Sequence, residues 1–162
     1  MYMFVKGLSV NYKVKGIEIN NHDSIYFRNE NIIYCTDLLD LQTKLKELHN
    51  IDVVIVDLDE FDCKDICTDI IYLLEPGTIR LNKFLMNNKN FVSDYQDKKI
   101  VLNRSAIKEE EVHNFERETG INVFYNLGNF NDRLERIKSV DGLLIKLGFD
   151  KQEIKKGFLS KL

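Results

Sequence analysis

The chain has 162 residues, of which 44% are hydrophobic and 30% are charged, and its formal net charge is −3. This length and composition fit one folded α/β or α+β domain with its own core, and they exclude a disordered or low-complexity chain. The negative charge argues against nucleic acid as a partner, and no segment has the pattern of a membrane span or a signal peptide, so we expect a cytoplasmic protein.

Short apolar segments along the chain have the pattern of strands in a parallel sheet. The segment "KVKGIEIN" alternates between apolar and polar residues, whereas "VVIVD" is continuously apolar, which is typical of a strand buried on both faces. In chain order the expected strands are 13–20, 53–57, 70–75, 99–103 and 121–126.

Amphipathic segments between these strands predict covering helices with recognisable ends. "KGLS" reads as the end of a first helix, and the expected N-caps of the next three are Thr36 or Asp37, Thr78, and Ser105. Gly120 is expected to end the helix that Ser105 caps, and Gly148 the amphipathic helix that follows it. The alternation of strands and helices predicts an α/β fold, a three-layer α/β/α Rossmann-like sandwich with a mostly parallel sheet, in one domain over residues 1–149.

Polar residues that follow parallel strands should share the carboxyl edge of the sheet. This set comprises Glu18, Asn20, Asp57, Asp59, Glu75, Asn103, Arg104 and Asn126. An aspartate that ends a buried strand, such as Asp57, can hold Mg²⁺ through water beside a nucleotide. Acidic residues also end strands simply because the chain returns to solvent, and for Asp57 alone we favour that interpretation.

The three cysteines, Cys35, Cys63 and Cys67, are an odd number in a chain without an export signal, so we expect reduced thiols. A zinc site at Cys63 and Cys67 is the alternative, but the spacing is not Cys-x-x-Cys and the histidines lie elsewhere.

The order of "VVIVDLDEFD", "TDIIYLLEPGTIRLNKFL" and "KKIVLNRSAIKEEEVHNFERETGINVFYNLGNFNDR" resembles the later part of the MinD/ParA family of P-loop ATPases, the deviant Walker-A group within the SIMIBI class. The resemblance covers residues 13–147 and implies a P-loop NTPase-like fold. Asp57 then matches the Walker-B carboxylate and metal position, and Asn103 matches the asparagine that reads the adenine edge. The resemblance also places Arg104 and Glu18 at the nucleotide site, whereas Asn103 could instead turn the chain and Arg104 could be a surface cation.

The sequence departs from this family at the phosphate-binding loop, because no Gly-Lys-Ser/Thr motif occurs. The chain resembles the fold from partway through its first helix, without the loop and the central strand before it, so the neighbouring strands would have unpaired edges. Three explanations stay open: a fragment of a longer protein, a different pairing of the flanking strands, or a gap filled by "MYMFV" or a second chain.

A receiver domain of response regulators is the second resemblance. There a buried strand also ends in the aspartate that accepts a phosphoryl group, which would be Asp57. The sequence departs from that pattern as well, since "EIN" is no acidic pair and Arg104 stands where a lysine is expected.

The carboxyl-terminal segment 150–162 is expected to form an amphipathic helix that begins with a capping box of Asp150 and Glu153. It resembles the basic tail by which MinD-type proteins hold the membrane, which would make the protein peripheral at the inner face. Packing of the same face against the domain is the alternative that we favour. The residues of this face are Ile154, Phe158, Leu159 and Leu162.

These observations predict a module with a nucleotide-hydrolase fold that lacks its own phosphate loop, cannot hydrolyse ATP alone and binds ATP or ADP with Mg²⁺ weakly or not at all. It would act as a regulatory or positioning protein through a protein partner or as a homodimer. As a fragment, it would belong to an ATP-dependent positioning ATPase of cell division, plasmid partition or pilus assembly.

Overall fold

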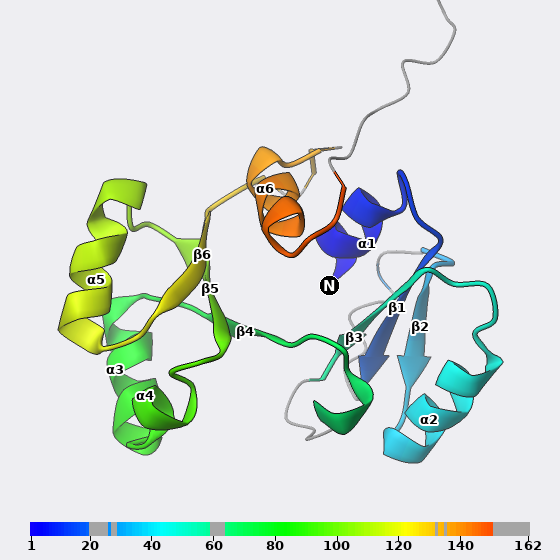
Figure 1. Ribbon diagram of the computed structural model, residues 1–162, viewed down its shortest axis with the longest axis horizontal. Coiled ribbons are helices and arrows are strands. Elements are labelled where there is room, and N and C mark those ends of the chain that lie inside the picture. Colours follow the sequence, from blue (N-terminus) through cyan, green and yellow to red (C-terminus); the bar gives the residue numbers. More distant parts are fainter. Residues whose placement is uncertain (20–25, 27–28, 59–63, 132, 135, 151–162) are drawn as a thin grey trace, which may run out of the picture. The chain divides into compact units, whose positions relative to one another are not determined.

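The computed structural model describes residues 1–19, 26, 29–58, 64–131, 133, 134 and 136–150. The chain forms two compact units, one of Met1–Cys63 with Val140–Leu162 and the other of Lys64–Ser139. Each unit contains a three-stranded parallel sheet with its own helices (Figure 1). The α/β class with parallel strands that we expected from the sequence is therefore confirmed.

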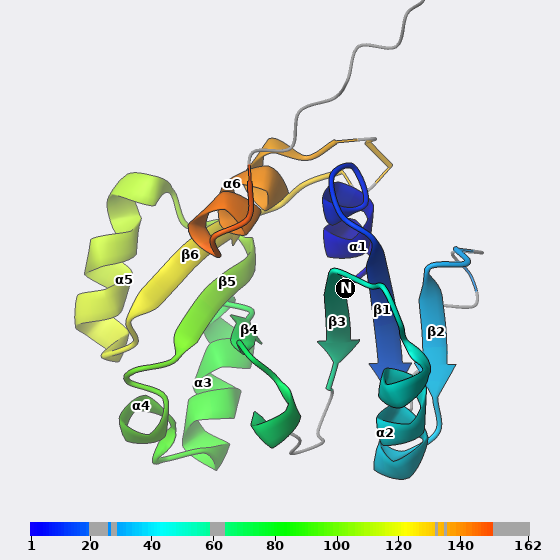
Figure 2. The ribbon, with the colours of Figure 1, turned by 45° about the vertical axis from the view of Figure 1, so that its right-hand side comes forward.

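The sheet of the first unit has β1 (Val14–Ile19) at its centre, between β2 (Ile32–Cys35) and β3 (Val53–Asp57), as Figure 2 shows. The expected strands 13–20 and 53–57 correspond to β1 and β3. Strand β2 was not predicted from the sequence, because a four-residue apolar segment is too short to show a period.

Helix α2 (Leu38–Glu47) covers one face of this sheet, and α1 (Tyr2–Leu8) packs on β1 from the other face. The α2 side is a cluster of fully buried residues, Ile17, Ile19, Cys35 and Leu41. The segment "MYMFV" is therefore helical within α1, so it does not fill a gap in the sheet as a strand. Helix α6 (Lys138–Lys146) packs on α1, where Leu144 lies against Gly7.

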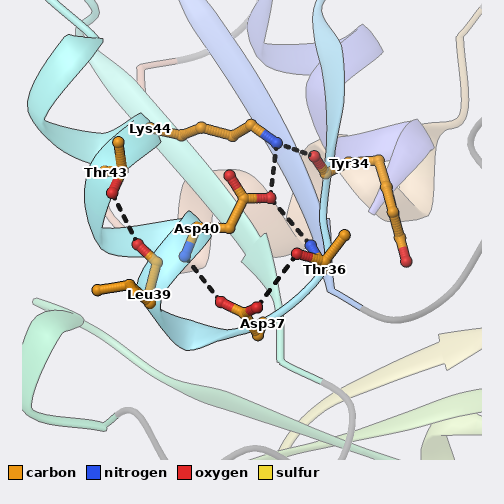
Figure 3. A network of polar contacts seen from close by, with 7 residues as sticks. All are labelled: Tyr34, Thr36, Asp37, Leu39, Asp40, Thr43 and Lys44. Carbon is orange, nitrogen blue, oxygen red and sulfur yellow. Dashed lines mark hydrogen bonds and ion pairs between the residues drawn. The ribbon is translucent and has the colours of Figure 1, made fainter.

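The start of α2 is fixed by a reciprocal set of hydrogen bonds (Figure 3). The Asp37 carboxylate accepts a hydrogen bond from the Asp40 backbone N–H at 2.9 Å, and the Asp40 carboxylate accepts one from the Thr36 N–H at 3.0 Å. Lys44 donates to the Asp40 carboxylate at 2.9 Å and also to the carbonyl oxygen of Tyr34. Of the two expected caps, Asp37 is therefore the N-cap, and Lys44 ties the helix to the end of β2.

The sheet of the second unit has β5 (Lys99–Ser105) between β4 (Ile71–Leu74) and β6 (Val123–Gly128). Three helices gather on one face of this sheet in Figure 1: α3 (Thr78–Asn87), α4 (Phe91–Asp94) and α5 (Val112–Thr119). Two short 3₁₀ helices, η2 (Lys64–Ile66) and η3 (Glu109–Glu111), lie in its connections. The core beneath the helices consists of Leu74, Leu81, Phe91, Ile100, Leu102 and Ile121.

Two helix starts in this unit differ from the expectation. The N-cap of α3 is Gly77, so Thr78 is the first helical residue and no side chain caps the helix. Ser105 is the last residue of β5, and its hydroxyl oxygen accepts a hydrogen bond from the Ile107 N–H at 3.1 Å. The serine therefore stabilises a turn instead of capping a helix, and the helix expected over 106–119 is divided into η3 and α5.

The two expected helix ends are confirmed by left-handed glycines. Gly120 follows α5 with φ 73°, and Gly148 has φ 96° two residues beyond α6. Glycine is favoured at such positions because it has no Cβ. The sequence predicts Leu134 on the apolar face of the helix that ends at Gly148, but α6 begins only at Lys138, so Leu134 lies before it and is 51% exposed.

Candidate functional site

The four residues predicted to contact nucleotide fall into two pairs, one in each unit. Glu18 and Asp57 lie on neighbouring strands of the first sheet. Asn103 and Arg104 are consecutive residues of β5 in the second sheet. Each pair lies at the carboxyl end of its strands, which is where the strand pattern predicted them.

Glu18 and Asp57 face each other across parallel strands. They are register partners in β1 and β3, so their side chains project from the same face of the sheet. Glu18 is 4% exposed, whereas Asp57, at the end of its strand, is exposed. The structure therefore places one buried and one accessible carboxylate side by side.

The amino end of α1 lies near this acidic pair. Burial lowers the pKa of the Met1 α-amino group, and the negative charges of Asp57 and Glu18 partly oppose that effect. Gly16, two residues before Glu18 on the same face, makes room for α1 beside β1. The acidic pair thus lies on the face that α1 covers.

The described residues contain no group of three or more histidine, cysteine, aspartate or glutamate side chains that could hold a metal ion. Asp57 and Glu18 could supply two carboxylates to Mg²⁺, which commonly keeps several water ligands and binds phosphate oxygens of a substrate. Of the two carboxylates, Asp57 is accessible to such an ion, whereas Glu18 is 4% exposed on the face that α1 covers.

Asn103 and Arg104 lie in a β-bulge. Leu102 pairs with Asn126 and Ser105 pairs with Gly128, so β5 has one residue more than β6 between these two points. Arg104 adopts the left-handed conformation with φ 52°, which is unusual for a residue with a side chain. A bulge bends a strand and redirects the side chains within it.

Arg104 and Arg80 both contact the carboxylate of Glu75, and Arg80 was not among the site residues predicted from the sequence. Nη1 of Arg104 lies 3.8 Å from Oε1 of Glu75, at the end of β4, while Arg80 in the first turn of α3 donates to Oε2 of the same side chain. Arg80 lies five residues after Glu75 in the sequence, beyond the Pro76–Gly77 turn. This spacing alone does not predict that the two side chains meet, because their distance depends on the geometry of the turn.

Asn126 of β6 holds the connection after β5. Its amide nitrogen donates to the Ile107 carbonyl oxygen at 2.9 Å and to the Glu109 carboxylate at 3.4 Å. Its Oδ1 is buried without a hydrogen-bond partner among the residues that the structure describes. Next to it, burial and the charge of Glu109 raise the pKa of Tyr125.

Other residues selected from the sequence lie outside the described part of the chain. They are Asn20, Asp59, Cys63, Glu153 and the tail residues Ile154, Phe158, Leu159 and Leu162. None of the helices in the described ranges has the length and the hydrophobicity that a membrane-spanning segment needs.

No family model, no curated protein and no solved structure gives a significant match.

Proposed function

We propose that the protein is a MinD/ParA-like module with a nucleotide-hydrolase fold, which lacks its own phosphate-binding loop and acts as a regulatory or positioning protein through protein contacts. The main support for this proposal is the position of β3 in the sheet of the first unit. This apolar strand, which ends at the candidate Walker-B residue Asp57, lies at the edge of the first unit's sheet.

The backbone direction of β3 shows which groups face the open edge. The Val53 N–H donates to the Lys13 carbonyl oxygen at 3.2 Å, so the polar groups of Val53 point toward β1. Successive residues of a strand alternate in this direction, so the backbone groups of Val54 and Val56 point away from β1. Within the first unit's sheet, this side of β3 has no neighbouring strand among the described residues.

The sequence of β3 is unlike that of a protected edge. Edge strands are commonly protected by charges, proline or bulges, yet Val53 to Val56 contain neither a charge nor a proline. We propose that the occupant of this edge is β3 of a second copy. A two-fold axis would pair β3 of one copy antiparallel with β3 of the other. Because Val53 to Val56 are all apolar, apolar side chains of the two copies would then lie next to each other.

Sedimentation velocity over a range of concentrations tests this contact. The wild-type chain should dimerise, and Val56→Pro should remain monomeric because proline removes an N–H that faces the open edge. Val56→Ala is the matched control, since it shortens the same side chain and keeps the N–H. A monomeric wild-type chain at high concentration, or a dimer that persists in Val56→Pro with an intact circular dichroism spectrum, would contradict the proposed contact.

A separate assay addresses the nucleotide. Phosphoryl transfer depends on positioning and charge neutralisation, which the missing loop would supply, so the chain alone should show no more ATP turnover than Asp57→Ala. Bound Mg-ADP or Mg-ATP would raise the unfolding midpoint by mass action. Any such shift should disappear in Asp57→Ala and in Asn103→Ala, and turnover by the wild-type chain alone would refute this part of the proposal.

A receiver-like phosphoacceptor is the second candidate, favoured by the exposed Asp57 at the end of β3 with Glu18 opposite. Incubation with acetyl phosphate and Mg²⁺ should then add one phosphoryl group, detected by intact-mass spectrometry. Asp57→Asn is the control, and an unmodified wild-type chain excludes this alternative.

A further inference from the structure

The carboxyl end of β4 and β5 carries two arginines around one glutamate. Glu75 follows β4, Arg80 lies in the first turn of α3, and Arg104 lies in the bulge of β5. Oε2 of Glu75 accepts a hydrogen bond from Arg80 and Oε1 lies 3.8 Å from Nη1 of Arg104. Three segments of the chain thus bring two guanidinium groups to one carboxylate.

This cluster has an excess of positive charge and is open to solvent. The side chains of Arg80 and Arg104 are 74% and 72% exposed, whereas that of Glu75 is 34% exposed. Each guanidinium has several N–H donors in a planar arrangement that matches carboxylate and phosphate oxygens. The single carboxylate of Glu75 neither neutralises both guanidinium groups nor uses all of their N–H donors. A further anion can therefore bind to them.

The backbone of Arg104 indicates that its position has a use beyond the ion pair. A left-handed conformation is costly for a residue with a side chain, and exposed ion pairs contribute little to stability. The long contact with Glu75 therefore does not offset the strain. Strained residues of this kind cluster at ligand sites, where the surrounding structure holds them in place.

We propose that Arg80 and Arg104 bind a phosphate group and that Glu75 occupies their site in the unliganded chain. A phosphate dianion carries more charge and more acceptor oxygens than a carboxylate, so it can displace Glu75 or share its arginines. The site shares Arg104 with the nucleotide module proposed above, but it requires neither Asp57 nor the dimer.

Inorganic phosphate is the first probe, titrated at constant ionic strength and followed through the NMR signals of the arginine Nε–H groups. Phosphate should shift the signals of Arg80 and Arg104 along a saturable curve, and Arg80→Ala and Arg104→Ala should each weaken binding roughly tenfold. Arg117→Ala is the matched control, because it removes an exposed arginine of α5 in the same unit and should leave the binding constant unchanged.

Glu75→Gln separates this proposal from general electrostatic attraction. The substitution removes the competing carboxylate charge and retains a side chain of the same shape, so phosphate should bind severalfold more tightly. Arg104→Gly gives a second test, because glycine tolerates the left-handed backbone while the guanidinium is lost, and it should weaken binding as much as Arg104→Ala. Circular dichroism spectra of the variants establish that each remains folded.

An ADP titration distinguishes two sources of the phosphate. Tighter binding of ADP than of inorganic phosphate, reduced by Asn103→Ala, would identify a nucleotide, whereas equal affinities would identify a site for phosphate alone. Either result supports the arginine site, even if the chain is monomeric. Shifts that do not saturate, or that decrease equally in Arg117→Ala, would overturn it.

Discussion

Gly16 of β1 and Val5 of α1 lie so close that a Cβ on the glycine would be 2.8 Å from Cγ2 of Val5. Met1 Sδ would lie 3.1 Å from the same added carbon. Helix α1 can therefore approach the sheet only because residue 16 has no side chain.

Gly16→Ala should consequently lower the free energy of unfolding by about 1–3 kcal/mol, the usual range for overpacking a core. Chemical denaturation monitored by circular dichroism measures the loss. Gly77→Ala is the control, because a Cβ there would meet nothing within 4 Å, and it should cost only about 0.5 kcal/mol, the difference between glycine and alanine at the N-cap of α3. Equal effects of the two substitutions would show that the approach of α1 to β1 is not tight.

Asp37→Ala should destabilise the chain by about 1 kcal/mol, because it removes the acceptor for the Asp40 N–H at the start of α2. Asp37→Asn should lose much less, since asparagine is also a good N-cap. Urea denaturation of the three proteins provides the comparison, and an unchanged midpoint in Asp37→Ala would contradict the role of this cap.

The same helix start predicts a dependence of stability on pH. The hydrogen bond from Lys44, with one from the Thr36 N–H, lowers the pKa of Asp40 below its ordinary value. The stabilisation from the ionised carboxylate is therefore present above the unfolded-state pKa of about 3.9 and is lost as the pH falls through the lower folded-state value. Asp40→Asn should remove this part of the acid sensitivity, measured as the difference in unfolding free energy between neutral and acidic pH. An identical pH profile in both proteins would refute the assignment.

Cys35 should resist thiol reagents in the folded chain. Its side chain is fully buried at the end of β2, and burial raises its pKa, so little thiolate is present and none is accessible. Cys67 is only partly buried, although burial raises its pKa as well. Brief treatment with iodoacetamide at pH 8 followed by peptide mass spectrometry should find Cys67 modified before Cys35. Denatured protein, in which both should react, is the control.

Arg104→Gly should stabilise the chain by about 1 kcal/mol, because glycine adopts the left-handed conformation without the steric cost of a Cβ. Asn50→Gly provides a comparison at a second left-handed residue with a side chain, at φ 59°, and should gain less because asparagine tolerates this region better. Thermal unfolding measures both differences. A loss of stability in Arg104→Gly would mean that the contact with Glu75 outweighs the strain.

Local signals in the sequence determined much of the secondary structure. The continuous apolar run of β3 and the alternation in β1 identified both segments as strands, although β3 is only partly buried and β1 is buried on both faces. Asp37, Gly120 and Gly148 act on backbone groups a few residues away, so these helix ends could be predicted. Ser105 failed as a predicted cap because a serine hydroxyl can stabilise a turn or a helix start equally well, and only the length of β5 decided between them.

The sequence by itself therefore determined the α/β class, five of the strands and the acidic end of β3, because these follow from the periodicity and chemistry of neighbouring residues. Only the tertiary structure decided the pairing of Glu18 with Asp57 across two strands, the edge position of β3, and the meeting of Arg80 with Arg104 at Glu75. These relationships join residues far apart in the chain, and they depend on strand order, register and a bulge, which no local pattern encodes.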